Sequence, residues 1–236
     1  HSLRNEQTKA EFRVQLRALL RAAVDGPVEI LIPMVADASH MRGVRKQLDL
    51  AKEELVRDGK NFRSAQVKVG AMIETGSAVW GIDDILKLSD FVSVGTSDLT
   101  QYILGKERGY NPDPGRDDFP KQFGPHHPSV LKALDHVVRK CRKAGVEVAA
   151  CGAMTDHQYY VPLLVGLGFP TVSVSPRGAS TFRDEIAGLD YKVCKALVQW
   201  AKNRSGGDPA AVYEQLEAFF TSLREDEAYR VPRLRG

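Results

Sequence analysis

The feature that most constrains the fold is a repeated alternation between short apolar runs and segments with helical periodicity. The first run, Val28–Val35, is nearly continuous in apolar residues, as is typical of a strand covered on both faces. The other predicted strands are Val67–Ile73, Asp90–Gly95, Val146–Cys151 and Thr171–Ser175. Apolar residues recur with helical spacing over 8–24, Asp37–Gly59, Ser77–Leu88, Ser129–Ala144, Asp156–Gly168 and within Phe182–Asn203. Because strands alternate with helices, the pattern predicts a parallel β/α architecture with five strands.

Local signals set the boundaries of these elements. Ser39 and Ser129 are predicted to cap the helices that they begin, and Gly145 is a C-terminal stop signal. The segment Tyr110–Pro128 is rich in proline and glycine and is predicted to be a loop. Ser205–Pro209 is predicted to be a linker, followed by a helix over Ala210–Leu223 and a polar tail.

Composition and charge exclude several classes of protein. The chain has 236 residues, and its net charge of +3 comes from interspersed charges, which gives little support to nucleic-acid binding. No apolar run approaches the ~20 residues of a membrane helix, and the first residues are polar, unlike a signal peptide. The three cysteines are an odd number, which does not suggest a framework of disulfides, and they include no CxxC pair. We therefore expect a reduced, cytoplasmic protein with free thiols.

Polar residues gather where the predicted strands end, which is where parallel β/α folds bind ligands. Glu74 and Asp98 follow two successive strands, and adjacent parallel strands lie about 4.8 Å apart. Two carboxylates so placed can share a hard cation such as Mg²⁺ or Mn²⁺. The alternative is that both acids stabilise the start of the helix that follows, and position alone does not separate the two interpretations.

Two further residues near these strand ends are candidates for catalysis or ligand binding. Cys151 ends a strand at a glycine turn, where a thiol can act as an acid or nucleophile; the alternative is a small buried residue. Arg108 follows the helix that begins near Asp98 and could bind a phosphate or carboxylate; the alternative is a solvated surface arginine. Cys141 and Cys194 lie in helical patterns and are predicted to be structural.

Several segments, in their order and spacing, are specific together. They are QLRALLRAA, ILIPMV, IETGSA, GTSDLTQY, HPSVLKAL and CG. With them the chain resembles, over about Leu3–Trp200, the phosphoenolpyruvate-binding C-terminal domain of enzyme I of the sugar phosphotransferase system. The wider group includes phosphoenolpyruvate synthase and pyruvate phosphate dikinase. The resemblance implies a (β/α)₈ barrel of the TIM type, of which this chain shows about five strands.

The resemblance also implies a site. Glu74 and Asp98 would hold Mg²⁺, in agreement with their predicted pairing, and Arg108, Ser97 and Asp98 would contact the substrate. Cys151 would protonate the enolate of pyruvate at carbon 3 after loss of the phosphoryl group. In enzyme I the phosphoryl group passes to a histidine on a separate domain, and relatives dimerise through the barrel domain. The implied partners are phosphoenolpyruvate or pyruvate, a phosphohistidine domain or carrier protein, and a second copy of the chain.

Three departures from the family pattern bear on activity. Ser97 stands where the family usually has asparagine, Ala153 where it has glutamate, and His1 where it has arginine. The strands with two further phosphate-binding arginines would lie upstream of His1. The expected organisation is an N-terminally incomplete barrel domain over residues 1–204, followed by a linker, helix and tail over residues 205–236. We expect that the isolated chain does not complete phosphoryl transfer.

The sequence thus predicts a phosphoenolpyruvate-binding domain that transfers phosphoryl to a protein histidine with Mg²⁺ and releases pyruvate. Two alternatives remain open. The first is a catalytically impaired domain that binds phosphoenolpyruvate or pyruvate without turnover, which the three departures favour modestly. The second is a Mg²⁺-dependent lyase or aldolase that acts through a pyruvate enolate.

Overall fold

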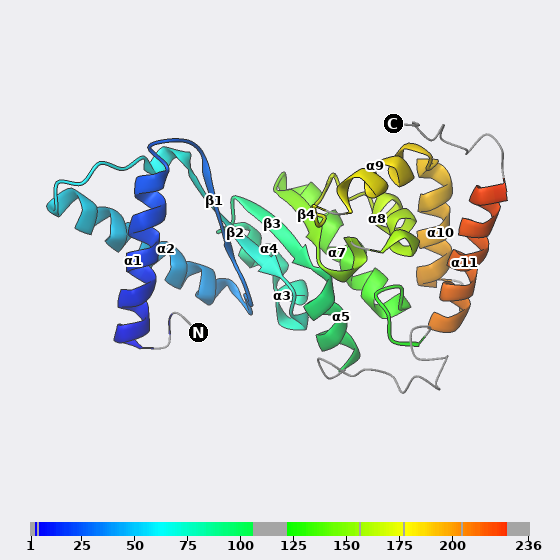
Figure 1. Ribbon diagram of the computed structural model, residues 1–236. Helices are drawn as coiled ribbons and strands as arrows, with labels where there is room; N and C mark the ends of the chain where they lie inside the picture. Colours follow the sequence, from blue (N-terminus) through cyan, green and yellow to red (C-terminus); the bar gives the residue numbers. More distant parts are fainter. Residues whose placement is uncertain are drawn as a thin grey trace, which may run out of the picture. The chain divides into compact units, whose positions relative to one another are not determined.

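The computed structural model describes Leu3 and residues 5–105, 122–155, 157–176, 178–203 and 205–225. The five strands form one sheet in the order β1-β2-β3-β4-β5, which is also their order along the chain, and the pairing is parallel (Figure 1). The α/β class and the five strands predicted from the sequence are therefore confirmed. The chain divides into two compact units, which are His1–Ser93 with Lys140–Glu147, and Val94–Arg139 with Val148–Gly236.

The elements that lie in the first unit alternate as the sequence predicts. They are α1 (Glu6–Ala22), β1 (Val28–Ile32), α2 (Ala38–Arg57), the short 3₁₀ helix η1 (Ser64–Gln66), β2 (Val67–Ile73), α3 (Gly76–Trp80), α4 (Ile82–Leu86) and the start of β3 (Phe91–Gly95). The predicted second strand agrees with β2 at both ends. The helix predicted over Ser77–Leu88 is interrupted at Gly81, which is both the C-cap of α3 and the N-cap of α4.

The N-cap predicted for α2 is wrong by two residues. Asp37, not Ser39, caps this helix, and its Oδ1 accepts the backbone N–H groups of Ser39 at 2.7 Å and His40 at 3.2 Å. These hydrogen bonds, with that from the Ser39 hydroxyl as the largest contribution, lower the pKa of Asp37 below its ordinary value. A carboxylate is also favoured over a hydroxyl at the positive end of the helix dipole.

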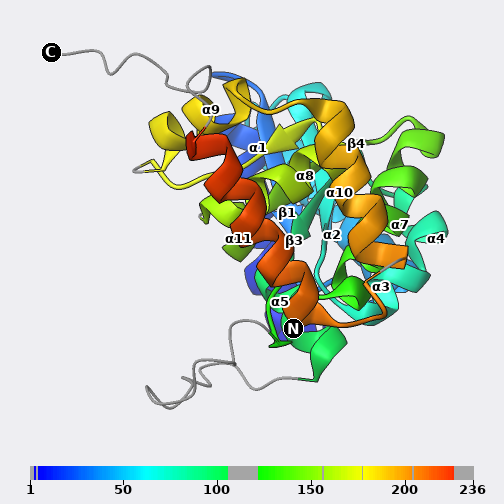
Figure 2. The ribbon, with the colours of Figure 1, turned by 90° about the vertical axis from the view of Figure 1, so that its right-hand side faces the viewer.

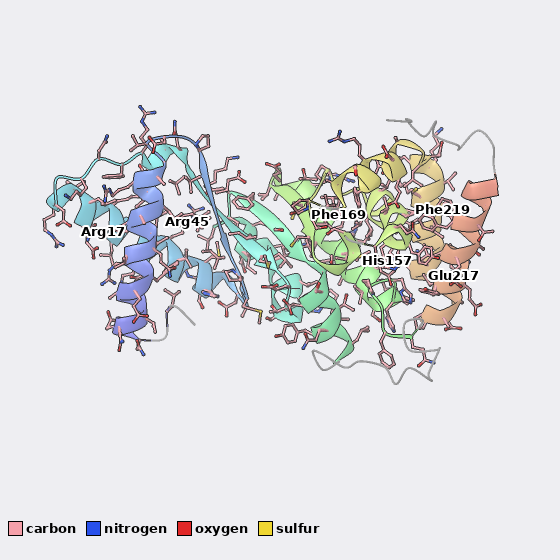
Figure 3. The ribbon with its side chains drawn as sticks, in the orientation of Figure 1. Arg17, Arg45, His157, Phe169, Glu217 and Phe219 are labelled. Atoms are coloured by element: carbon pink, nitrogen blue, oxygen red, sulfur yellow. The ribbon has the colours of Figure 1, made fainter. Side chains whose placement is uncertain are left out.

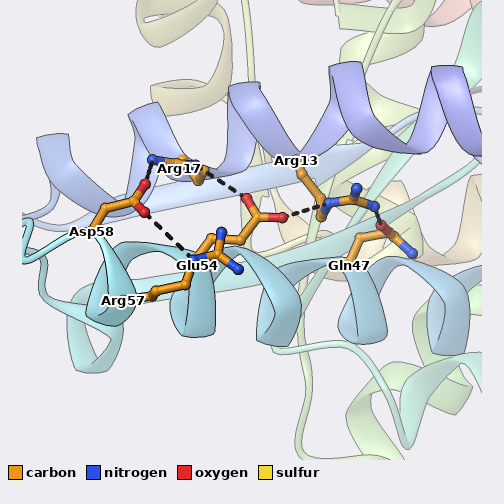
Figure 4. Close-up of polar contacts among 6 residues, drawn as sticks. All are labelled: Arg13, Arg17, Gln47, Glu54, Arg57 and Asp58. Atoms are coloured by element: carbon orange, nitrogen blue, oxygen red, sulfur yellow. Dashed lines mark hydrogen bonds and ion pairs between the residues drawn. The ribbon is translucent and has the colours of Figure 1, made fainter.

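A row of charged and polar side chains joins α1 to α2 (Figure 4). Arg13 donates to Glu54 at 3.0 Å and to Gln47 at 2.8 Å, and Arg17 donates to Glu54 at 3.2 Å and to Asp58. These side chains are partly exposed, so each ion pair contributes about 0.2–1 kcal/mol. The row fixes the pairing of the two helices, while Leu16 and Leu20 of α1 supply buried apolar contacts.

A second polar contact ties α2 to the start of β3. Arg45, labelled in Figure 3, donates to the carbonyl oxygen of Leu88 at 3.0 Å and pairs with Asp90 at 2.9 Å. Asp90 in turn accepts the backbone N–H of Val69 at 2.7 Å. Asp90 was predicted to begin the third strand. It instead precedes β3, and its side chain binds the neighbouring strand.

The second unit contains the rest of the alternation. Its elements are the end of β3, α5 (Thr96–Leu104), most of α7 (Pro128–Ala144), β4 (Glu147–Cys151), the 3₁₀ helices η2 (Ala153–Thr155) and η3 (Gln158–Tyr160), α8 (Val161–Leu167), β5 (Thr171–Val172), α9 (Ala179–Ala187), α10 (Tyr191–Asn203) and α11 (Pro209–Glu225). The fifth strand has two residues, fewer than predicted. The helical content predicted within Phe182–Asn203 separates into α9 and α10.

The start of α7 differs from the prediction. The helix begins at Pro128, so Ser129 lies inside it and is not its cap. The side chain of His127 takes the capping position, and its Nδ1 accepts the backbone N–H of Ser129 at 3.1 Å. Proline at the first helical position has the required φ and no N–H to satisfy. The helix ends before Gly145, as predicted, and this glycine has a φ of 68°.

The final helix, α11, packs within the second unit. Figure 2 shows α11 beside α10, and Val212, Leu216 and Phe220 are buried. An aromatic cluster joins α11 to the region of η3: Tyr213 lies edge-on to His126 at 5.4 Å between ring centroids, and Phe220 lies 5.1 Å from Tyr159. The predicted helix over Ala210–Leu223 is therefore confirmed. The assignment of residues 1–204 and 205–236 to separate parts stays a prediction.

An ion pair lies between α7 and α10. The ammonium of Lys202 lies 2.9 Å from the Asp135 carboxylate, and Lys202 is only 7% exposed. Arg139 also binds Asp135, at 3.0 Å. Among the residues that the structure describes, none of the helices combines the length and apolar character that a membrane span requires.

Candidate functional site

Glu74 follows the carboxyl end of β2 and is buried. Glu74 is 3% exposed, and its Oε1 accepts the backbone N–H of Met34 at 2.7 Å. The next residue, Thr75, caps α3 by accepting the N–H of Ala78 at 3.2 Å, and it donates to the carbonyl of Val35 at 3.0 Å. The helix-capping role left open for Glu74 therefore belongs to Thr75.

Met34 is a feature that the sequence did not reveal. Its φ is 53°, and it is the one non-glycine residue with positive φ in the described part of the chain. A bulky residue in this region is strained, and such strain is often stored at functional sites. In this conformation the backbone N–H of Met34 donates a hydrogen bond to Glu74, the candidate metal ligand.

The carboxyl end of β3 passes directly into α5. Thr96 is fully buried, Ser97 is exposed and Asp98 is partly buried in the first turn of the helix. The N-cap residue is Gly95, which has no side chain to cap the helix. A carboxylate in the first turn is favoured by the helix dipole, so the alternative interpretation of Asp98 is compatible with its position.

The carboxyl end of β4 carries Cys151 and Gly152. The Cys151 thiol is half-buried, and its Sγ lies 3.4 Å from the carbonyl oxygen of Val94 in β3, to which it donates. Gly152 has a φ of 91°. A Cβ at Gly152 would lie 2.8 Å from the hydroxyl oxygen of Ser97 and 3.0 Å from that of Thr96, so a larger residue would require these side chains to shift.

Thr96 connects the two strand ends directly. Its Oγ1 donates to the carbonyl oxygen of Cys151 at 2.7 Å and accepts the N–H of Met154 at 3.2 Å. The sequence motifs do not single out Thr96 as a site residue. The signal available in the sequence was a threonine directly after a strand, next to the predicted site, but its partners lie more than fifty residues away in the chain.

The other two thiols lie outside this region. Cys141 and Cys194 are fully buried. Burial raises the pKa of Cys141 to about 12 and, with a smaller effect from Asp190, that of Cys194 to about 11. The prediction that these two cysteines are structural agrees with their environment, because a protonated and covered thiol reacts slowly.

The predicted site residues are thus distributed over both units. Asp98, Ser97 and Cys151 lie in the second unit, where β3 and β4 end together, whereas Glu74 lies in the first. The pairing of Glu74 with Asp98 stays a prediction. Within the described ranges, no group of three or more His, Cys, Asp or Glu side chains is placed to hold a metal ion. Arg108 lies outside the described residues.

Comparison with known proteins decides the family. The sequence profile of the family described as "PEP-utilising enzyme, PEP-binding domain" matches residues 3–191, which is most of the chain. The chain belongs to this family. The matched range includes all the strand-end residues described above, so the resemblance identified from the motifs is confirmed.

Curated relatives of the PEP-binding domain carry phosphotransferase names. A "Phosphoenolpyruvate-protein phosphotransferase" from Cupriavidus necator is 38% identical over 175 residues, covering 74% of this chain and 29% of that protein. One from Lactococcus lactis subsp. cremoris is 34% identical over 186 residues, covering 79% and 31%. "Multiphosphoryl transfer protein 1" from Escherichia coli is 33% identical over 221 residues, covering 93% and 25%. The chain spans between a quarter and a third of the length of these relatives.

A solved structure supports the fold of the PEP-binding domain. The crystal structure of a citrate lyase from Burkholderia xenovorans LB400 superposes with a TM-score of 0.55, covering 91% of this chain and 69% of that chain. Sequence identity is 17%, so this likeness concerns the fold alone.

Proposed function

We propose that this chain is the phosphoenolpyruvate-binding domain of a phosphotransferase, which transfers the phosphoryl group to a histidine on another protein domain and releases pyruvate. Family membership and the names of the relatives support the proposal. The observation that carries it is the hydrogen bond of 2.7 Å between Thr96 and the Cys151 carbonyl. This bond joins two segments of the family motif, GTSDLTQY and CG, at one edge of the sheet.

Phosphoenolpyruvate is negatively charged, so the reaction first requires that this charge be neutralised. Phosphoryl transfer depends on positioning and charge neutralisation more than on covalent chemistry by the protein. We propose that Glu74 and Asp98 hold Mg²⁺ and that Arg108 and Ser97 bind the substrate. The donor set suits this ion, because both ligands are carboxylates. When bound, Mg²⁺ would neutralise charge on the phosphate and carboxylate of phosphoenolpyruvate.

The chain's own contacts prepare Glu74 for that role. Its Oε1 is occupied by the Met34 N–H, which fixes the orientation of a carboxylate that is almost fully buried. A buried carboxylate whose orientation is fixed in this way is suited to hold a hard cation such as Mg²⁺.

Cys151 is proposed as the acid. Loss of the phosphoryl group leaves the enolate of pyruvate, whose carbon 3 must gain a proton. The Cys151 thiol would give its proton to that carbon and become a thiolate, which solvent then protonates again. The Sγ of Cys151 lies 3.4 Å from the Val94 carbonyl oxygen, to which the thiol donates.

The same proposal names the partners. They are phosphoenolpyruvate and pyruvate, a phosphohistidine domain or carrier protein, and a second copy of the chain in a homodimer. It also implies that the reaction takes place in the cytoplasm, where phosphoenolpyruvate is formed.

The test is calorimetric binding of phosphoenolpyruvate with and without Mg²⁺, followed by incubation of labelled phosphoenolpyruvate with the chain and a phosphohistidine domain from the same source. We expect Mg²⁺-dependent binding that Asp98→Asn abolishes. Label should reach the histidine domain at most at a rate far below that of a full-length relative, because the isolated chain is not expected to complete the transfer by itself. Wild-type Mg²⁺ dependence in Asp98→Asn would contradict the assignment of this ligand.

A second candidate is a domain that binds phosphoenolpyruvate without turnover. The observations that favour it are Ser97 and Ala153, which stand where the family usually has asparagine and glutamate. Binding without phosphoryl transfer would identify this function. Restoring the family residues with Ser97→Asn and Ala153→Glu should then raise transfer.

A further inference from the structure

We infer that Thr96 is a positioning residue for the Cys151 thiol, acting through the turn that follows β4. The catalytic meaning of this role rests on the proposed function, but the structural role does not. Thr96 is fully buried. Its single hydroxyl serves both sides of the turn, since it donates to the Cys151 carbonyl at 2.7 Å and accepts the Met154 N–H at 3.2 Å.

The turn between those two contacts has little freedom to move. Gly152 has a φ of 91°, and a Cβ built on it would approach the Ser97 and Thr96 hydroxyl oxygens to 3.0 Å or less. The backbone of the turn therefore lies close to the first residues of α5. Thr155 adds a hydrogen bond within the turn, because its hydroxyl donates to the Gly152 carbonyl at 2.8 Å.

The thiol is held at the same time. Cys151 Sγ donates to the carbonyl of Val94, which lies in β3 two residues before Thr96. The backbone and the side chain of Cys151 are thus both attached to the end of β3. Loss of the Thr96 hydroxyl would release the carbonyl of Cys151 and with it the geometry that places Sγ on Val94.

A neighbouring threonine shows the difference between this role and ordinary helix stabilisation. Thr100 is also buried in α5, but its hydroxyl donates to the backbone carbonyl of Thr96 at 2.7 Å, one turn earlier in the same helix. The two residues share type, helix and burial. They differ in that the Thr96 hydroxyl reaches the strand end that carries Cys151.

The test is the rate of alkylation of each cysteine by iodoacetamide in the full chain, mapped by mass spectrometry. We expect Thr96→Val to accelerate alkylation of Cys151 by about fivefold or more, because its thiol gains access to the reagent. Thr96→Ser retains the hydroxyl and should stay within about twofold of wild type, as should the matched control Thr100→Val.

Cys194 is the internal reference for loss of structure. It is fully buried in the same unit, so its alkylation reports opening of the fold. A positioning role changes Cys151 alone, whereas a merely structural role accelerates both thiols together. Thr96→Val with an unchanged Cys151 rate, or with equal acceleration at Cys194, would overturn the inference. If Thr96→Val does not fold, Thr96→Ser decides: an accelerated Cys151 in that variant overturns it.

A second measurement separates this inference from the proposed function. Protonation of the enolate runs in reverse when the methyl protons of pyruvate exchange with deuterium from the solvent, which NMR detects. We expect Mg²⁺-dependent exchange in wild type, a loss in Thr96→Val and recovery in Thr96→Ser. Absence of exchange in wild type would count against the proposed role of Cys151, and the alkylation rates would still decide the role of Thr96.

Discussion

The Glu74 carboxylate accepts the backbone N–H of Met34 at 2.7 Å, which links the end of β2 to a strained residue just beyond β1. The two residues are 40 positions apart in the chain. One carboxylate oxygen is committed to this contact, so a substitution can separate the structural part of the role of Glu74 from the proposed metal-binding part.

Glu74→Gln and Glu74→Ala are expected to differ for this reason. Glutamine retains an oxygen that can accept the Met34 N–H, whereas alanine leaves that buried donor unsatisfied at a cost of about 1–3 kcal/mol. Denaturant unfolding should therefore show a smaller loss of stability for Glu74→Gln than for Glu74→Ala. Calorimetry should show that both lose Mg²⁺-dependent binding of phosphoenolpyruvate. Retention of that binding by Glu74→Gln would remove Glu74 from the metal site.

Cys151 is expected to be the first thiol alkylated in the native protein. Burial raises the pKa of Cys141 to about 12 and that of Cys194 to about 11, and both side chains are fully covered, whereas Cys151 is half-buried. Mass spectrometry after brief iodoacetamide treatment should find the label on Cys151, and phosphoenolpyruvate with Mg²⁺ should protect it. Earlier labelling of Cys141 would contradict the assignment of the site.

Gly152→Ala is expected to destabilise the protein by more than Gly145→Ala. Both glycines have positive φ, so alanine strains either position by about 1 kcal/mol or more. A Cβ at Gly145 meets nothing within 4 Å, but one at Gly152 meets Ser97 Oγ at 2.8 Å. The difference between the two losses in free energy of unfolding, measured in urea, reports the close approach together with the larger φ of Gly152, 91° against 68°. Equal losses would mean that the turn can relax.

His127 is expected to make stability depend on pH. Burial lowers the pKa of His127 below its ordinary value, so the unfolded chain binds the proton first as the pH falls. The neutral imidazole caps α7 through its Nδ1, and protonation removes this acceptor. The contribution is therefore present above the unfolded pKa and is lost as the pH falls through the lower folded pKa.

The matched variant for this prediction is His127→Asn, which can cap the helix but does not titrate. Between about pH 7 and pH 5, the free energy of unfolding in urea should fall more steeply for wild type than for His127→Asn. His40, whose pKa is also lowered by burial, contributes equally to both proteins. Parallel pH dependences would exclude His127 as a titrating cap.

The final helix is expected to contribute to the stability of the second unit. Leu216 is fully buried on α11, so Leu216→Ala should cost about 2–5 kcal/mol. Glu214 is exposed on the same helix, and Glu214→Ala should be close to neutral. Thermal or denaturant unfolding of both variants provides the comparison. A neutral Leu216→Ala would show that α11 is dispensable, as expected of a segment outside the domain.

Local patterns were sufficient to predict most of the secondary structure. The second strand is predicted from its apolar residues with the same ends that β2 has, because a mostly buried strand is rich in apolar residues even though Lys68 is exposed. The end of α7 at Gly145 followed from the left-handed conformation that glycine adopts readily. Family membership likewise followed from short motifs in a fixed order.

The errors at helix starts have a common cause. Serine at position 39 or 129 is a good capping residue, but Asp37 and His127 lie two positions earlier and take that role. Which side chain caps a helix depends on the path by which the chain enters it. That path is set by packing of the preceding strand or loop, which propensity does not encode.

The sequence by itself determined the alternation of strands and helices, the family and the residue types at the strand ends. Only the tertiary structure decided that Glu74 binds the strained Met34 and that Thr96 binds both sides of the Cys151 turn. The partners in these contacts are separated by 40 to 58 residues. Periodicity reports which face of an element is buried, but a hydrogen bond between strand ends forms only when packing of the sheet brings those ends together.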